Sequence, residues 1–286
     1  MTRQQQTLGF RSDTEPKFHL YHGDCVAGMR RLEAESIDVV VTSPPYNLGI
    51  TYGVHDDNQN RIEYLKWTVE WASEVKRLLK PGGSFFLNVG AVPANPMMPH
   101  EIILILRDLF TLQNTFHWIK SISIRTRKGE TISAGHFKPL NSKRFLTDCH
   151  EFIFHLTKNG STPLDRLAIG VPYADKSNIR RWSHTKGVDK RCRGNTWFIP
   201  YETIRSSKDE RPHPATFPVE LPLNCVRLHG NVSSAVVMDP FLGIGHSALA
   251  AREAGVSEFI GFELDRTYID QAALSLSLPL TEIKTF

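Results

Sequence analysis

The chain contains 286 residues, of which 22% are charged and 41% are hydrophobic, and its formal net charge is +4 at pH 7. This length suits one large α/β domain with an insertion, or two small domains. No apolar run reaches the ~18 residues that a membrane-spanning helix needs, so we expect no contact with a membrane. The four cysteines, Cys25, Cys149, Cys192 and Cys225, form no Cys-x-x-Cys pair. We therefore expect reduced thiols and no metal site.

Positive charge is concentrated in the middle of the chain. Residues 120–211 hold 19 of the 34 basic residues but only 9 of the 30 acidic ones, so the remainder is net acidic. A solvated basic face is the ordinary explanation, but Trp118, Trp182 and Trp197 are interspersed with these charges and favour a surface for a polyanion. Residues 1–17 are polar and lack an apolar signal core, which indicates a loose tail on a cytoplasmic protein.

The first predicted elements lead into an acidic turn. Residues 18–22 alternate enough for a strand, and Val26–Ala34 are expected to be helical, with Met29 and Leu32 facing inward. Asp24, between the two elements, can accept hydrogen bonds from an adenine or a ribose, but it is also a common helix cap.

A short β-branched run, Ile37–Val41, predicts a buried strand that ends in Thr-Ser-Pro-Pro-Tyr-Asn. The prolines lack N–H groups for a ladder, so the chain turns and leaves Ser43 and Tyr46 at the carboxyl end of the strand, where open α/β sheets bind ligands. The Ser43 hydroxyl and the Pro44 carbonyl can accept hydrogen bonds from the amino group of cytosine or adenine. Held in this way, the nitrogen can direct its lone pair at an electrophilic methyl group. Tyr46 offers a ring face for a flipped base. Pro-Pro-Tyr alone is typical of a simple turn, but the whole stretch after a strand favours this chemistry.

Helices and strands then alternate. Helices are predicted over residues 61–80 and 100–109, and strands over residues 84–89, 115–124 and 151–157. Pro81-Gly82-Gly83 is expected to stop the first of these helices. The alternation is typical of a parallel, doubly wound sheet, with one antiparallel pair plausible at its edge. Residues 125–144 and 159–211 show no clear periodicity.

A second group of motifs lies near the C-terminus. Residues 211–218 contain His-Pro-Ala-x-Phe-Pro and precede a helix predicted to run through Leu228. A strand then ends at Asp239, a Gly-x-Gly turn opens a helix over 247–253, and the strand 258–263 ends in a carboxylate placed to bind ribose hydroxyls. A dehydrogenase also uses such a glycine turn, but Ser-Pro-Pro-Tyr and Asp-Pro have no role in one.

Taken in order, these motifs resemble those of the β group of DNA amino-methyltransferases, which methylate cytosine N4 or adenine N6. The shared motifs are Gly-Asp-Cys, (Asp/Asn/Ser)-Pro-Pro-(Tyr/Phe/Trp), His-Pro-Ala-x-Phe-Pro and Asp-Pro-Phe-x-Gly-x-Gly, and they span residues 18–275. The resemblance implies an α/β fold with a doubly wound, mostly parallel sheet, a Rossmann-like methyltransferase fold that is circularly permuted. It also implies S-adenosylmethionine as cofactor and double-stranded DNA as partner. It is compatible with a homodimer and with a cognate restriction endonuclease. Ile244-Gly245-His246 departs from the usual Ser-Gly-Thr.

The resemblance assigns a role to each part of the chain. A tail (1–17) precedes a catalytic half (18–124), a basic target-recognition region (125–211) and a cofactor-binding half (212–286). The predicted catalytic residues are Ser43, Pro44, Pro45 and Tyr46. The predicted cofactor-binding residues are Asp24, Cys25, His213, Pro214, Phe217, Asp239, Pro240, Phe241, Gly243, Gly245, Glu263 and Asp265. The predicted DNA-binding residues are Arg125, Arg127, Lys128, Lys143, Arg144, Arg180, Arg181, Lys190, Arg191 and Arg193.

Several alternatives stay open. Serine at position 43 favours cytosine N4 by resemblance, but both bases present an amino group beside a ring nitrogen. Carbon-5 methylation of cytosine needs a Pro-Cys nucleophile, and no cysteine here follows a proline. Two other hypotheses remain. The protein could bind DNA without methyltransferase activity, or it could be a methyltransferase that acts on RNA or on protein glutamine.

Overall fold

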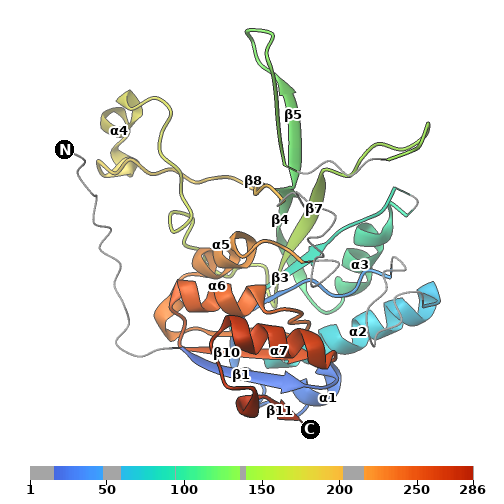
Figure 1. Ribbon diagram of the computed structural model, residues 1–286. Helices are drawn as coiled ribbons and strands as arrows, with labels where there is room; N and C mark the ends of the chain where they lie inside the picture. Colours follow the sequence, from blue (N-terminus) through green and yellow to red (C-terminus); the bar gives the residue numbers. More distant parts are fainter. Residues whose placement is uncertain (1–15, 48–58, 94, 136–139, 202–215, 286) are drawn as a thin grey trace.

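The computed structural model describes residues 16–47, 59–93, 95–135, 140–201 and 216–285 (Figure 1). In these ranges a nine-stranded sheet has the order β11-β1-β10-β9-β2-β3-β7-β4-β8, and β5 and β6 form a separate ribbon. The strands are β1 Lys17–His22, β2 Ile37–Thr42, β3 Leu79–Val89, β4 Thr111–Ile119, β5 Ser121–Arg125, β6 Thr131–Gly135, β7 His150–Thr157, β8 Thr196–Phe198, β9 Val236–Asp239, β10 Glu258–Glu263 and β11 Lys284–Thr285.

The strand directions confirm the doubly wound, mostly parallel sheet. From β11 to β3 every neighbouring pair is parallel. Strand β7 runs antiparallel to both β3 and β4. The expected antiparallel pair therefore exists, but its position at the sheet edge was wrong, because β7 is inserted between two strands. Its apolar residues Ile153, Phe154 and Leu156 are buried, which suits an interior strand.

Helices cover both faces of the sheet (Figure 1). They are α1 Cys25–Met29, α2 Arg61–Leu78, α3 Met98–Leu106, α4 Ser177–Arg181, α5 Glu220–His229, α6 His246–Ala254 and α7 Arg266–Ser275, with short 3-10 turns at Ser183–Thr185, Val232–Ser234 and Leu280–Glu282. One core cluster gathers residues of α5, α6 and α7, and a second gathers residues of α1, α2 and α3. In β2, Val39 and Val41 belong to the first cluster and Val40 to the second, so the β-branched run is buried on both faces. No helix of the described ranges is long and apolar enough to span a bilayer.

Three helix boundaries differ from the sequence expectation. The helix expected over 26–34 ends at Met29, that expected over 61–80 ends at Leu78, and that expected over 100–109 spans Met98–Leu106. The chain enters β3 at Leu79, so the Pro-Gly-Gly stretch lies in the strand and follows the end of α2. The buried stripe of α2 consists of Tyr64, Thr68, Trp71, Ala72, Val75 and Leu78. Aliphatic residues at the helix spacing, such as Ile62 and Val69, are exposed because the large aromatic rings take the inward face.

The basic region is more ordered than its sequence indicates. The strand expected over 115–124 is interrupted at Lys120, where the chain leaves β4 and starts β5. Strands β5 and β6 pair through five residues each. Strand β6 lies inside the stretch expected to be aperiodic, whereas β5, apart from Arg125, lies in the expected strand. The resulting hairpin projects away from the sheet (Figure 1). One of its faces carries the exposed Ile124 and Ile132 as a cross-strand pair, and hydroxyls line the other.

Two of the three tryptophans assigned to a polyanion surface belong to the core. Trp118 and Trp197 are buried, and their indole N–H groups donate to the backbone carbonyls of Ile199 and Gly194 at 2.8 and 3.0 Å. Only Trp182, which is 48% exposed, lies at the surface. The expectation failed because Trp118 in β4 and Trp197 in β8 are paired in the sheet and belong to one core cluster.

Candidate active site

The two motif-bearing strand ends are adjacent. Strand β2 pairs in parallel with β9, with Val39 opposite Val237 and Val40 opposite Met238. One residue before the Ser-Pro-Pro-Tyr stretch, the Thr42 hydroxyl donates to Asp239 Oδ1 at 2.5 Å. The chain leaves β2 toward β3 on one side and β9 toward β10 on the other. This is a topological switch point, where open α/β sheets bind ligands.

Asp239 holds this junction together. It is 1% exposed, and it also accepts hydrogen bonds from the Ser247 hydroxyl at 2.6 Å and from the Phe241 N–H at 3.0 Å. Burial raises the pKa of Asp239 to about 6, although the three donors act in the opposite direction. Both carboxylate oxygens face protein donors, so Asp239 fixes the start of the glycine turn relative to β2.

The glycine turn leads into α6. Gly243 and Gly245 have φ values of +53° and +89°, which side-chain-bearing residues rarely adopt. A Cβ at Gly245 would lie 2.8 Å from the Cβ of Ala272, so the glycine also permits close packing against α7. The Gly243 N–H donates to Glu263 Oε2 at 2.7 Å, and the Asp265 N–H donates to Oε1 at 2.8 Å. Burial raises the pKa of Glu263 to about 7.

The predicted cofactor-binding residues gather along three neighbouring strands. Asp24 follows β1, Asp239 ends β9 and Glu263 ends β10, and these strands are consecutive in the sheet. Asp24 is exposed and caps α1 by accepting from the Ala27 N–H at 2.8 Å. Asp265 caps α7. The carboxylates at these strand ends can accept hydrogen bonds from the hydroxyl groups of a nucleoside.

The remaining predicted cofactor residues are apolar or buried. Cys25 is buried, and burial raises the pKa of its thiol well above the usual range. Pro240 is buried as well, and the Phe241 ring packs edge-on against Trp71, with ring centroids 5.3 Å apart. Phe217 is 8% exposed, whereas His213 and Pro214 lie outside the described residues.

His246 explains the departure from the usual glycine-loop sequence. Its Nδ1 donates to the carbonyl oxygen of Phe217 at 2.6 Å. The imidazole therefore connects the glycine turn to the Phe-Pro end of the His-Pro-Ala-x-Phe-Pro motif. The substitution replaces a hydroxyl with a longer donor that reaches across to the neighbouring segment.

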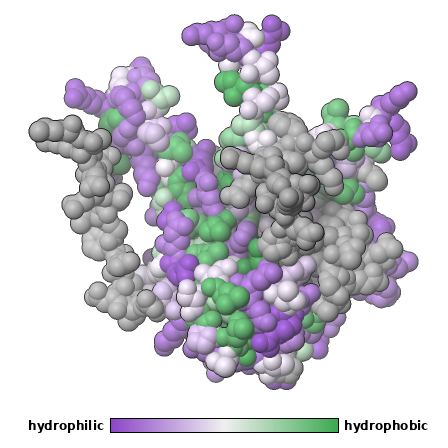
Figure 2. Space-filling model, in the orientation of Figure 1, coloured by the Kyte–Doolittle hydropathy of each residue, from purple (hydrophilic) through white to green (hydrophobic). Residues whose placement is uncertain are grey.

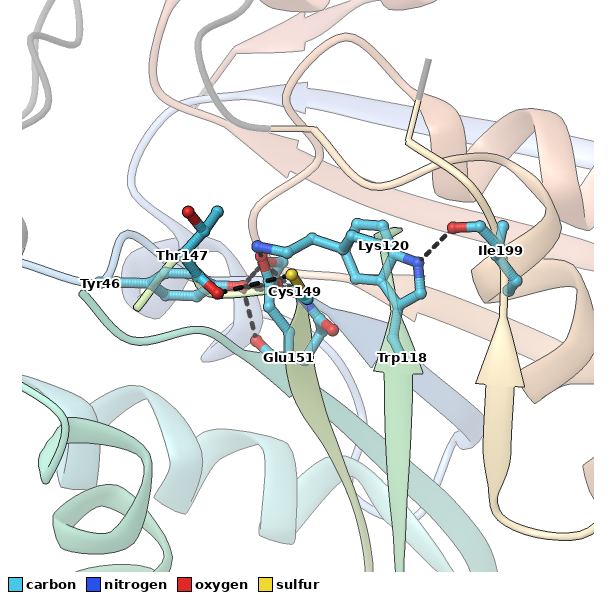
Figure 3. Close-up of polar contacts among 9 residues, drawn as sticks. Tyr46, Trp118, Lys120, Thr147, Cys149, Glu151 and Ile199 are labelled. Atoms are coloured by element: carbon cyan, nitrogen blue, oxygen red, sulfur yellow. Dashed lines mark hydrogen bonds and ion pairs between the residues drawn. The ribbon is translucent and has the colours of Figure 1, made fainter. Parts of the chain in front are cut away.

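The predicted catalytic stretch is held by a polar network on its other side. Figure 3 shows Tyr46, Lys120 and Glu151 turned toward one another from three segments of the chain. Tyr46 is 9% exposed, and its hydroxyl lies 2.5 Å from Ser43 Oγ and 3.2 Å from Glu151 Oε2. The Asn88 amide nitrogen contacts the Tyr46 hydroxyl and Glu151 Oε2, each at 2.7 Å. Lys120 Nζ donates to Glu151 Oε1 at 3.0 Å.

Sequence reasoning missed Asn88, Lys120 and Glu151 as members of this site. The available signal was polarity at strand ends: Asn88 interrupts an apolar strand near its end, and Glu151 stands near the start of another.

The two prolines of the motif lie at the end of β2, as the sequence suggests. Pro44 is buried, and the Pro45 carbonyl accepts from the Tyr64 hydroxyl at 2.9 Å, which anchors the stretch to α2.

The predicted DNA-binding residues lie on projecting segments. Exposed positions are Arg125, Arg127, Lys128, Lys143, Arg144, Arg180, Arg181 and Arg191, and half-buried positions are Lys190 and Arg193. Figure 2 shows hydrophilic side chains at the tips of these projections, which include the β5–β6 hairpin and α4. Arg193 lies 3.5 Å from Glu220 in an ion pair, which partly neutralises it. The structure therefore separates two sites: strand ends that can hold a nucleoside, and basic projections beyond them.

Fold and site together define a Rossmann-like methyltransferase. A family model described as DNA methylase, of the N6 and N4 type, matches residues 37–274, and the chain belongs to this family. This confirms the resemblance drawn from the motifs.

Individual relatives agree with the family. The chain is 30% identical over 277 residues to the type II methyltransferase M.BglII of Bacillus subtilis, covering 92% of this chain and 70% of the relative. It is 26% identical over 255 residues to the DNA adenine methyltransferase YhdJ of Escherichia coli K12, covering 87% and 79%. Among solved structures, the cytosine-N4-specific PvuII DNA methyltransferase superposes with a TM-score of 0.63 at 21% identity, covering 91% of this chain and 88% of that one. This last likeness concerns the fold.

Proposed function

We propose that this DNA methyltransferase transfers a methyl group from S-adenosylmethionine to cytosine N4 in a flipped base of double-stranded DNA. The observation that carries the proposal is the Thr42–Asp239 hydrogen bond between the ends of β2 and β9. Because these ends are adjacent, Ser43 and the glycine turn open onto the same edge of the sheet. A methyl donor held at one strand end can then meet an amino group held at the other.

The cofactor half of the proposal rests on Glu263 and the glycine turn. Each Glu263 oxygen already accepts one backbone N–H, and each retains a lone pair for a ribose hydroxyl. Asp24 supplies a further exposed carboxyl group. S-adenosylmethionine, when bound, supplies an electrophilic methyl group on a sulfonium.

The catalytic half of the proposal rests on acceptors at the end of β2. Ser43 Oγ and the Pro44 carbonyl accept hydrogen bonds from the target amino group and orient its lone pair. Tyr64 and Tyr46 hold this stretch by hydrogen bonds at Pro45 and Ser43. The methyl group would pass directly to the nitrogen as its bond to the sulfonium sulfur breaks, and the nitrogen would then release one proton to solvent, with no covalent bond between the base and the enzyme. Stacking of the base on Tyr46 remains a prediction, since most of that ring is covered.

The basic projections support DNA as the substrate. Eight of the ten predicted contacts are exposed, and the projecting hairpin has the two-stranded shape that fits a major groove. A base extruded from the duplex would then reach the strand ends below. A homodimer and a companion restriction endonuclease stay predictions.

Adenine N6 is the second candidate, and the name of the E. coli relative favours it. Mass analysis of nucleosides from unmethylated DNA treated with the protein and cofactor decides between the bases. We expect N4-methylcytosine, with no product from the Ser43→Ala variant. N6-methyladenine alone would overturn the choice of base, and no methylated nucleoside at all would overturn the function.

A further inference from the structure

We propose that Glu151 is a positioning residue that makes Ser43 a hydrogen-bond acceptor toward the target amino group. The inference rests on the proposed function and concerns how the catalytic serine is prepared. Within the described residues, Ser43 makes no direct hydrogen bond to Glu151. The two are joined through Tyr46, whose hydroxyl lies between Ser43 Oγ and Glu151 Oε2.

The direction of the hydrogen bonds that run from Ser43 through Tyr46 to Glu151 follows from the chemistry of the groups at each end. An ionised carboxylate only accepts hydrogen bonds, whereas a tyrosine or serine hydroxyl donates one and accepts others. Besides Ser43 Oγ at 2.5 Å, the Tyr46 hydroxyl faces two acceptors at 3.2 Å, the backbone carbonyl of Asn88 and Glu151 Oε2. The charged acceptor is the stronger, so the Tyr46 proton points to Glu151. Tyr46 oxygen is then left to accept the proton of Ser43.

With this direction of donation, the Ser43 proton is directed at Tyr46, and the Ser43 oxygen presents only lone pairs to an incoming group. Ser43 Oγ and the Tyr46 hydroxyl oxygen are 2.5 Å apart, close enough for a short hydrogen bond donated by serine. An amino group that enters the site therefore meets an acceptor rather than a competing donor. Negative charge on Glu151 also strengthens the chain, since each hydrogen bond polarises the next.

Asn88 and Lys120 keep the carboxylate in this role. The Asn88 amide nitrogen faces Glu151 Oε2 at 2.7 Å, so the carboxylate fixes which end of the amide points toward Tyr46. Asn88 Oδ1 is buried and has no hydrogen-bond partner among the described residues, so the amide is oriented by the contacts of its nitrogen. Lys120 pairs with Oε1 and leaves Oε2 to Tyr46 and Asn88. Gly90 makes room for the arrangement, because a Cβ there would lie 3.0 Å from both the Tyr46 ring and Glu151.

The test replaces Glu151 with glutamine and measures single-turnover methylation of unmethylated genomic DNA with radiolabelled S-adenosylmethionine. In the Glu151→Gln variant, Lys120 attracts the oxygen of the introduced amide. The N–H₂ group of that amide then faces Tyr46 and Asn88, so hydrogen-bond donors point at one another. We expect Glu151→Gln to lower the rate constant of methyl transfer ~10²-fold or more, the size seen when one preorganised donor or acceptor is removed. Cofactor affinity and the KM for DNA should change less than twofold.

Tyr46→Phe interrupts the same chain but leaves the Glu151–Lys120 ion pair intact, so it serves even if Glu151→Gln folds poorly. We expect a similar loss of rate, and the double variant should be no slower than the slower single variant, since both changes break one chain. Glu74→Gln is the matched control: Glu74 is an ion-paired carboxylate of similar exposure, 18% against 14% for Glu151, on α2 away from the strand ends.

Three results would overturn the inference: a Glu151→Gln rate within threefold of wild type, losses that multiply in the double variant, or a raised KM with an unchanged rate constant. If wild-type protein methylates no DNA, the proposed function fails first, which is a different outcome from active wild type with active Glu151→Gln.

Discussion

Replacing Gly245 with alanine should damage both stability and cofactor binding, and Gly255 provides an internal comparison. The two glycines flank α6 and have positive φ values of +89° and +75°. Alanine in this left-handed region costs about 1–2 kcal/mol at either position. Only Gly245 has a neighbour in the way, the Ala272 Cβ at 2.8 Å, whereas a Cβ at Gly255 would meet nothing within 4 Å. Overpacking of this kind adds about 1–3 kcal/mol.

Urea denaturation of both variants tests the comparison. We expect Gly255→Ala to lower the free energy of unfolding by about 1–2 kcal/mol and Gly245→Ala by about 2–5 kcal/mol. Calorimetric titration with S-adenosylmethionine should show at least a tenfold loss of affinity for Gly245→Ala, because the turn must shift with the start of α6. Gly255 lies at the far end of that helix, so its variant should bind normally. Equal destabilisation, or unchanged cofactor affinity for Gly245→Ala, would refute the close-packing explanation.

Three further outcomes follow from the structure. The raised pKa of Glu263, about 7 against an ordinary 4.5, means that its contribution to stability is present at low pH and is lost as pH rises through about 7. By proton linkage this amounts to about 3 kcal/mol at most, so thermal unfolding without cofactor should show a fall in stability from pH 5 to 8 that Glu263→Gln flattens. The Arg127→Ala/Lys128→Ala double variant should reduce the salt dependence of DNA binding by about two phosphate contacts in fluorescence anisotropy, and an unchanged slope would remove the hairpin tip from the interface. Trp197→Ala should cost about 3–5 kcal/mol of stability, whereas Trp182→Ala should leave unfolding unchanged; the reverse order in a denaturant titration would contradict their burial.

The parts of the fold that could be predicted are those written in strong local patterns. The β-branched run before Ser43 and the strand before the glycine turn both appeared where expected, because buried parallel strands need continuous apolar sequence. The inward face of α2 carries Tyr64 and Trp71 together with Val75, whereas Ile62 and Val69 are exposed, so aliphatic spacing alone does not define that face. The β5–β6 hairpin was only partly predicted: most of β5 falls in the expected strand, whereas β6 was missed, and the hairpin has no core to face.

The candidate site also has parts that could be predicted from the sequence and parts that could not. Motif residues next to strand ends were predictable, because the carboxyl ends of parallel strands meet at one edge of a sheet. The role of Asp239 as the bond between two strands was not, since its partners Thr42 and Ser247 lie 197 residues away and 8 residues away in the sequence. His246 was recognised only as a departure, and its use became visible through the distant Phe217 carbonyl.

The polar network around Ser43 depends on where one strand was inserted. An antiparallel strand begins at the edge where its parallel neighbours end, so Glu151, near the start of β7, lies two residues before Ile153, which pairs with Asn88 near the end of β3. Had β7 paired only with β4 at the margin of the sheet, as the sequence led us to expect, Glu151 would face Trp118 but would not lie beside β3. Insertion between β3 and β4 therefore does more than complete the sheet. It brings a carboxylate, with Lys120 as its counter-ion, behind the Ser43 hydroxyl, which we propose accepts a hydrogen bond from the target amino group.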